Sequence, residues 1–159
     1  MLHFFHLDDD NACARVSFMV PILDAYLSDY GYTVHRVEPS EDNTYHYAQC
    51  TIDNCKYCEA GLRKLTRVFI PLYNYETQRV EIWDRSQFVI GLTLEPLYKR
   101  YSSIPSKMFK ITRHGKKFDK LTSYEVTFVK DVEITDNITD DIVRYIQNDV
   151  IATQEVKLI

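Results

Sequence analysis

The chain has 159 residues, 45% of them hydrophobic and 26% charged, which is the size and composition of one folded globular domain and excludes a disordered chain. Its net charge of −4 conceals three blocks, because residues 1–55 carry −7, residues 56–120 carry +8 and residues 121–159 carry −5. A basic middle between acidic ends is typical of a surface that binds a polyanion, although an uneven solvated surface has the same composition.

The sequence also indicates a cellular compartment. No apolar run approaches the roughly 18 residues of a membrane span, so no membrane partner is expected. The first residues, MLHFFHLDDDN, become acidic without a basic start and so differ from a signal peptide. We therefore expect a cytoplasmic protein, in which clustered cysteines bind a metal or take part in catalysis instead of forming disulfides.

Short alternating segments separated by turn residues predict a mainly β chain. The expected strands are 14–20, 32–37, 45–50, 67–74, 79–85, 108–113 and 123–129, with turns at 40–43 and 75–78 closing two hairpins.

Two helices are expected beside these strands. Ser86 can cap an inserted helix that carries Phe88, Val89 and Leu92, with an irregularity at Pro96, and Thr139 can cap an amphipathic helix over 140–150. Several short antiparallel strands with a helix inserted midway predict a small barrel of the OB-fold type. We expect this OB-like domain to cover residues 1–130, with a zinc-binding subdomain at about 33–62, and residues 131–159 to form an acidic helical extension.

Three of the four cysteines lie in the stretch CTIDNCKYC, residues 50–58. A hairpin that turns at Asp42-Asn43 places His35 opposite Cys50, with Cβ atoms about 5 Å apart, whereas His46 lies about 13 Å along the strand from Cys50. Structural zinc takes four ligands in a tetrahedron. The sequence therefore predicts a structural Zn²⁺ site, with a redox pair or unrelated buried thiols as alternatives, and Cys13 as a core thiol. The predicted ligands are His35, Cys50, Cys55 and Cys58.

The second hairpin has the composition of a surface for single-stranded nucleic acid, on which bases stack on rings and cations follow phosphates. Alternation places Val68, Ile70, Leu72, Val80 and Ile82 inward. The residues placed outward are Arg67, Phe69, Tyr73, Trp83 and Arg85. Further basic residues before and after this hairpin are expected to extend the positively charged surface, namely Arg63, Lys64, Arg113, Lys116 and Lys117, with Phe118 beside them. Rings packed under a helix and a solvated hairpin tip are the alternatives.

Catalytic motifs are missing from the sequence. There is no glycine-rich phosphate loop, no G-x-S-x-G and no H-E-x-x-H. Three cysteines and a histidine also fill the coordination sphere of zinc and leave no position for a reacting water. We therefore do not expect an enzyme.

The order of motifs resembles that of a known family over residues 4–128. Along the chain come Leu7-Asp-Asp-Asp…Arg15-Val-Ser-Phe, Val34-His35, Cys50…Cys55-x-x-Cys58, Val80-Glu-Ile-Trp and Phe109-Lys-Ile-Thr-Arg-His-Gly-Lys-Lys-Phe-Asp-Lys-Leu-Thr-Ser-Tyr-Glu-Val. This order resembles the zinc-containing single-stranded DNA-binding proteins of tailed phages. More distantly, it is similar to the OB-fold core of the helix-destabilising protein of T-even phages.

The resemblance implies the same four zinc ligands and a DNA cleft along 63–85 and 110–118, which adds Lys110 to the contacts. It also implies a largely sequence-independent role in phage DNA replication, recombination or repair, in the cytoplasm of an infected bacterium. Residues 131–159, with seven acidic and two basic side chains, are expected to dock phage replication or recombination proteins or to contact a second copy of the chain.

Two other functions fit the sequence. One is a zinc-stapled protein-interaction module that binds an acidic partner, and the other is an accessory domain of a nucleic-acid enzyme. Single-stranded DNA binding requires exposed rings at Trp83, Tyr73 and Phe118, whereas a protein-interaction module tolerates their burial.

Overall fold

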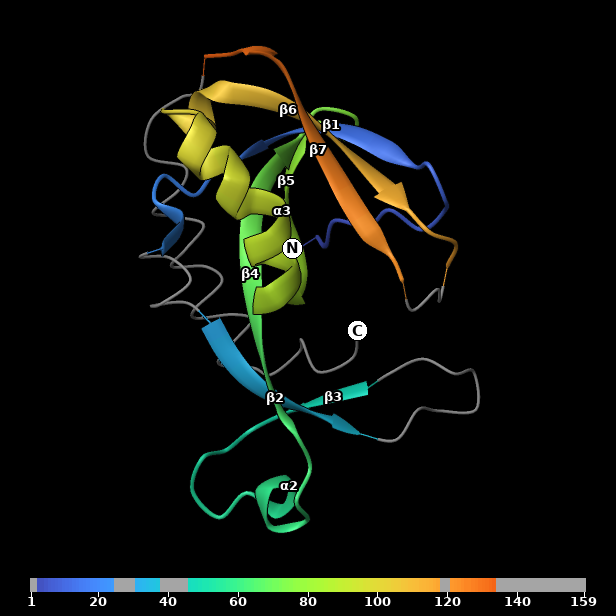
Figure 1. Cartoon of the computed structure of the whole chain (residues 1–159), viewed down its shortest axis with the longest axis vertical. Helices are drawn as coiled ribbons and strands as arrows, with labels where there is room; N and C mark the ends of the chain where they lie inside the picture. Colours follow the sequence, from blue (N-terminus) through green and yellow to red (C-terminus); the bar gives the residue numbers. More distant parts are fainter. Residues whose placement is uncertain (1–2, 25–30, 38–45, 118–120, 134–159) are drawn as a thin grey trace.

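The computed structural model describes residues 3–24, 31–37, 46–117 and 121–133, which are coloured in Figure 1. They form one seven-stranded antiparallel sheet with the strand order β3-β2-β4-β1-β6-β7, and β5 pairs with β4 outside this path. The seven strands are β1 (Cys13–Phe18), β2 (Gly31–Val37), β3 (His46–Gln49), β4 (Lys64–Asn74), β5 (Arg79–Ser86), β6 (Lys107–His114) and β7 (Ser123–Asp131). The predicted mainly β class is confirmed, and each predicted strand is present.

The sheet is open. Within the described residues, β3 and β7 stand at opposite ends of the strand order and no pairing joins them. The predicted closure of the strands into a small barrel is therefore not formed by this part of the chain.

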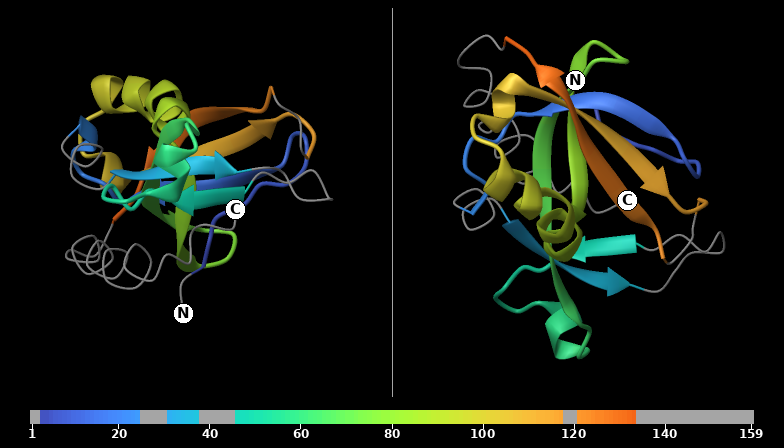
Figure 2. Two further views of the ribbon diagram at one scale, coloured as in Figure 1. Left: turned by 90° about the horizontal axis from the view of Figure 1, so that it is seen from below. Right: turned by 45° about the horizontal axis from the view of Figure 1, so that its top comes forward.

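Strand β4 joins the two halves of the molecule. Its first residues, 64–68, pair with β2, and its last residues, 72–74, pair with β1 along the same edge, while β5 occupies the other edge. In Figure 1, β2, β3 and the short helix α2 (Lys56–Glu59) lie at one end of β4, and β1, β6 and β7 lie at the other end. The right-hand view in Figure 2 shows the same separation.

Helix α3 (Gln87–Arg100) is the predicted inserted helix, and it covers one face of the sheet. The Ser86 hydroxyl accepts a hydrogen bond from the Val89 N–H at 3.2 Å, as expected of an N-cap, and the helix continues past Pro96. Its buried side chains are Ile90, Leu94 and Leu97, which join the core formed by β1, β4, β5 and β6. Phe88 and Leu92 instead face solvent, with 74% and 65% of their surface exposed. A short 3₁₀ helix, η1 (Ile104–Ser106), leads from α3 into β6.

The orientation predicted for the β4–β5 hairpin is wrong for Trp83. Asn74 pairs with Arg79 across a four-residue loop, so Ile70 faces Trp83 and Pro71 faces Ile82. Trp83 therefore shares the core face with the aliphatic residues of β4 and is fully buried. Phe69, on the opposite face, is also fully buried, because it stacks on Tyr32 with ring centroids 4.5 Å apart.

Cys13 is exposed and is not a core thiol, because it lies on the opposite face of β1 from the buried Ala14 and Val16. Phe118, the helix predicted over 140–150 and nearly all of the 131–159 extension lie outside the described residues. Of the helices that the structure describes, none has the length and apolarity needed to span a membrane.

Candidate metal centre

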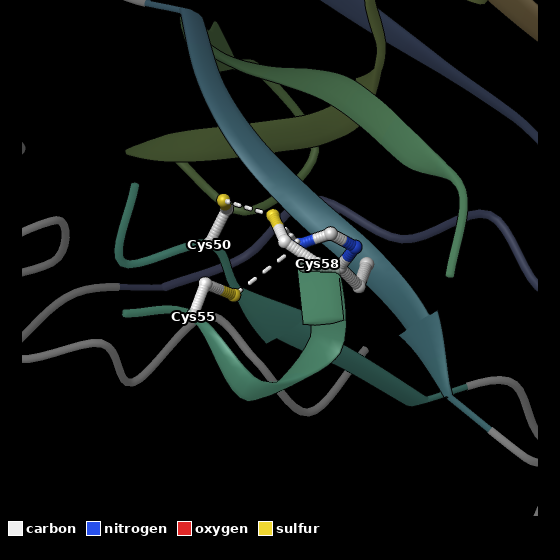
Figure 3. A group of neighbouring side chains, drawn as sticks. Cys50, Cys55 and Cys58 are labelled. Carbon is white, nitrogen blue, oxygen red and sulfur yellow. Dashed lines mark hydrogen bonds between the residues drawn. The ribbon is translucent and has the colours of Figure 1, made fainter. Parts of the chain in front are cut away.

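The structure brings the four predicted ligands together at the end of the molecule that carries α2. The ligand atoms of His35, Cys50, Cys55 and Cys58 all lie within 4.8 Å of one another. Figure 3 shows the three thiols converging from the loop and from α2. His35 is completely buried, and Cys50 and Cys55 are buried. This cluster can hold a metal ion.

Three of the six distances between these four atoms fit tetrahedral coordination. Zinc ligated at about 2.3 Å by sulfur and about 2.0 Å by nitrogen separates two sulfurs by about 3.8 Å and a sulfur from a nitrogen by about 3.5 Å. The Cys50 and Cys58 Sγ atoms are 3.6 Å apart, and His35 Nε2 lies 3.5 Å from the Sγ atoms of both Cys55 and Cys58. A donor set of one imidazole and three thiols suits zinc, because soft thiolates select it over hard cations.

A Schellman motif ends α2 and shapes the cysteine loop, which we define as residues 50–62. Gly61 adopts a φ of +75°, its N–H donates to the Cys58 carbonyl, and the Leu62 N–H donates to the Tyr57 carbonyl. This pattern of hydrogen bonds closes a helix at a residue in the left-handed region, where glycine is favoured. The C-x-x-C-x-x-G spacing therefore both places two ligands and turns the chain back toward β2.

The returning chain also orients the histidine. His35 Nδ1 lies 3.1 Å from the Leu62 carbonyl oxygen, which accepts its hydrogen bond. A proton on Nδ1 leaves the Nε2 lone pair directed at the cluster, which is the tautomer that a metal requires. Leu62 was not identified from the sequence as part of the site. Its position directly after Gly61 is the signal that indicates it.

Backbone amides favour the thiolate form of two cysteines. Hydrogen bonds from the main chain of Cys58 and Thr51 lower the pKa of the Cys55 thiol to about 5. The Ile52 N–H, followed by His35, lowers the pKa of Cys50, whereas burial raises the pKa of Cys58. Because the thiolate is the ligand form, Cys55 is prepared for a metal at neutral pH.

The pKa of His35 responds to the same cluster. Burial lowers this pKa, but hydrogen bonds to Cys50, the Leu62 carbonyl and Cys55 outweigh burial and raise it above its ordinary value. The sulfur atoms thus favour a positive charge on the Nε2 side of the ring, and a bound cation would lie on that same side, between Nε2 and the sulfur atoms.

The predicted hairpin register is wrong by two residues. His35 faces Ala48, not Cys50, and Cys50 follows the end of β3, where its N–H donates to the Thr33 carbonyl. A shift of two residues keeps each side chain on its face of the strand, because side chains alternate with a period of two. Cys50 therefore lies diagonally from His35 and still reaches the cluster.

The structure separates the predicted DNA contacts into two groups. Arg67 and Arg113 are buried and have structural partners, because Arg67 pairs with Asp84 at 3.0 Å and Arg113 donates to the carbonyls of Leu7, Gly115 and Lys116. With the buried Phe69 and Trp83, these side chains are not at the surface that the sequence predicted. Tyr73 and Arg85 are half-buried, and the exposed residues of the set are Arg63, Lys64, Lys110, Lys116 and Lys117.

A buried polar cluster, missed in the sequence, connects the hairpin that carries His35 to the rest of the sheet. The Tyr32 hydroxyl and Arg67 Nε both donate to Asp84 Oδ1, at 2.9 and 3.0 Å. Burial raises the pKa of Asp84 despite the Arg67 charge, and burial likewise raises the pKa of Tyr32. Tyr32 lies three residues before His35, so this cluster fixes the strand that carries the histidine ligand.

The chain matches no family model, and neither the curated proteins nor the solved structures include a match to it. Its function must therefore be inferred from its own residues.

Proposed function

We propose that this chain is a zinc-stapled protein that binds single-stranded DNA with little sequence preference. The observation that supports this proposal is the composition of the sheet face opposite α3, which we call the open face. Arg15 faces Lys110 across the β1–β6 ladder, and Ser17 faces Tyr73 across the β1–β4 ladder. Arg15 and Ser17 share one face of β1, so Lys110 and Tyr73 lie on the same face of the sheet.

Tyr75 extends this surface. Its hydroxyl lies 2.8 Å from Ser17 Oγ, and its ring packs edge-on against Tyr73 with centroids 4.9 Å apart. Both rings are half-buried, and Lys110 is exposed. Bases stack on partly exposed rings while cations follow the phosphates, so this face has the chemistry that a single strand requires. The proposed contacts therefore keep Tyr73 and Lys110 from the sequence prediction, add Tyr75, and no longer include Trp83 and Phe69.

The proposed metal is a structural Zn²⁺. Four protein ligands complete a tetrahedron, so the ion would fasten the β2–β3 hairpin to the cysteine loop and would leave no position for substrate. A proteolytically intact chain is expected to hold one zinc, and Cys58→Ser is expected to lose it in a competing-chelator titration. Cys13→Ser, a change at the exposed cysteine outside the cluster, is the matched control and should keep the zinc.

This proposal extends to an OB-related fold and a role in phage DNA replication, recombination or repair, on the basis of the sequence motifs quoted above. The open sheet with an inserted helix is compatible with an incomplete OB-type barrel.

The binding test uses a fluorescently labelled thymidine oligomer, a duplex of equal length and the zinc-loaded chain. Anisotropy should show tight binding to the single strand only, and the affinity should fall with salt at a slope of roughly −0.7 per neutralised phosphate. Lys110→Gln and Tyr75→Leu should weaken binding. Lys99→Gln, on α3 at the other face of the sheet, should leave it unchanged.

A zinc-stapled module that binds an acidic protein is the second candidate, and the burial of Trp83 favours it. This burial removes a ring that was expected to stack on bases. A zinc-loaded chain that binds neither the oligomer nor the duplex would contradict DNA binding and support this second function.

A further inference from the structure

The cysteine loop holds one apolar residue in an unusual backbone conformation. Ile52 adopts a φ of +67°, in the left-handed region, where a β-branched side chain is a genuine outlier. The other non-glycine residues with positive φ in the described part of the chain are all polar, namely Asn11, Asn54, Gln78 and Ser103. Asn54 lies in the same loop and shows the residue type that this conformation ordinarily takes.

The metal site explains the backbone of Ile52 but not its side chain. Its N–H hydrogen-bonds to Cys50, so the left-handed turn directs an amide toward a ligand. Asparagine or glycine would supply the same amide with less strain. The Ile52 side chain is 81% exposed and therefore adds no packing to the core. Strained backbone positions concentrate at functional sites, so the left-handed conformation of this exposed isoleucine motivates the hypothesis of a contact with a partner.

The charges of the cysteine loop and of the residues that directly follow it favour a nucleic acid as the partner of Ile52. Lys56, Arg63 and Lys64 are exposed in or directly after the cysteine loop, against two exposed carboxylates at Asp53 and Glu59. Apolar side chains insert between bases or cover their faces, and the unpaired bases of a single strand offer such faces at little cost in unstacking.

We propose that Ile52 is an apolar contact for an unpaired base at the tip of the cysteine loop, with the neighbouring cations on the flanking phosphates. This contact rests on the proposed single-stranded DNA binding and adds a second surface to the open face. The metal site thus has a further role, because it holds Ile52 in the conformation that displays it.

The test compares Ile52→Asn and Ile52→Gly with the wild-type chain, all loaded with zinc. Both substitutions relieve the left-handed strain, so a purely structural role predicts zinc affinity and thermal stability that are equal to or higher than those of the wild type. The proposed contact predicts that affinity for the thymidine oligomer falls about fivefold or more, because either substitution removes an apolar side chain that the bound base would cover. Ile22→Asn makes the same chemical change at an exposed isoleucine outside the loop and should bind like the wild type.

Each other outcome has a distinct meaning. If the wild-type chain binds the thymidine oligomer and both Ile52 variants bind it with the same affinity, the contact is overturned and the proposed function stands. Parallel losses of zinc affinity and oligomer affinity also overturn it, because they assign Ile52 to the fold of the loop. A wild-type chain that does not bind the oligomer overturns the proposed function and this contact together, and directs the search for a partner of Ile52 to proteins.

Discussion

Ile70 lies directly opposite Trp83 in the β4–β5 ladder, and this pairing directs the only tryptophan of the chain into the core. The Trp83 ring meets Phe5 and Tyr124 edge-on, with centroids 6.3 and 5.1 Å away. The tryptophan is thus a reporter of the folded core and not of a bound base.

We expect Trp83→Ala to destabilise the chain by about 3–5 kcal/mol, because the substitution leaves a large cavity in the core. Phe88→Ala removes a ring that is 74% exposed and should change stability by at most about 0.5 kcal/mol. Urea denaturation measures both changes. Strong quenching of the native Trp83 emission by acrylamide would contradict the buried position.

Gly61→Ala should weaken the metal site. No atom lies within 4 Å of an added Cβ, so the whole effect comes from a φ of +75°, which should disfavour alanine by about 1 kcal/mol. A competing-chelator titration should show zinc affinity reduced about fivefold, which corresponds to the same free energy.

Gly91→Ala is the control for this substitution. Gly91 lies within α3, and its added Cβ would meet only Glu95 Oε2 at 4.0 Å. Alanine there should raise stability by about 0.5–1 kcal/mol through helix propensity and leave zinc affinity unchanged. Equal effects at the two glycines would exclude the Schellman motif as the cause.

Tyr32→Phe should destabilise the chain by about 1–3 kcal/mol, because it removes a hydrogen-bond donor to Oδ1 of the buried Asp84 carboxylate. The other oxygen of this carboxylate, Oδ2, already has no hydrogen-bond partner among the described residues. Tyr101→Phe is a matched change at a ring that stacks on Phe128, and it should be nearly neutral. Thermal denaturation of both variants is the measurement. A neutral Tyr32→Phe would show that Arg67 alone satisfies Asp84.

The metal-free chain should lose stability as the pH falls from about 9 to about 5. The folded state lowers the pKa of Cys55 to about 5, so the thiolate contribution is complete above the ordinary thiol pKa and disappears as the pH falls through the folded value. The raised pKa of His35 acts in the opposite direction. We therefore compare the wild type with Cys55→Ala by urea denaturation in chelator, and expect a weaker pH dependence in the variant. Identical pH profiles would contradict a stabilised Cys55 thiolate.

The strands and the cluster of candidate metal ligands could be predicted because their signals are local. Alternating residues and turn clusters mark each strand, and three ligands lie within nine residues. The predicted hairpin register was wrong, yet the ligand set it selected is the set that the structure brings together, because an error of two residues preserves the face of His35.

The orientation predicted for Trp83 was wrong for a different reason. The predicted turn at 75–78 is the loop that the structure has, but the inward face of each strand was assigned from the alternation within that strand alone, and the pairing across the loop, which places Trp83 opposite Ile70, was not applied. Residues on both faces of β4 and of β5 are buried as well, so no polar face distinguishes the two sides of the hairpin. Arg67 and Arg113 were assigned to the surface for a related reason. Their partners, Asp84 and the Leu7 carbonyl, are brought to them only by the tertiary fold.

The short span of chain that supplies the metal ligands has a consequence for the order of folding. His35 through Cys58 form a local unit, whereas the β1–β4 and β1–β6 ladders join segments that are far apart in the sequence. Local contacts close with a smaller loss of chain entropy than distant ones. A metal bound early in folding would therefore order the β2–β3 pair and the cysteine loop before β4 pairs with β1. The cysteine loop leads directly into β4, and β4 is the strand on which the rest of the sheet assembles.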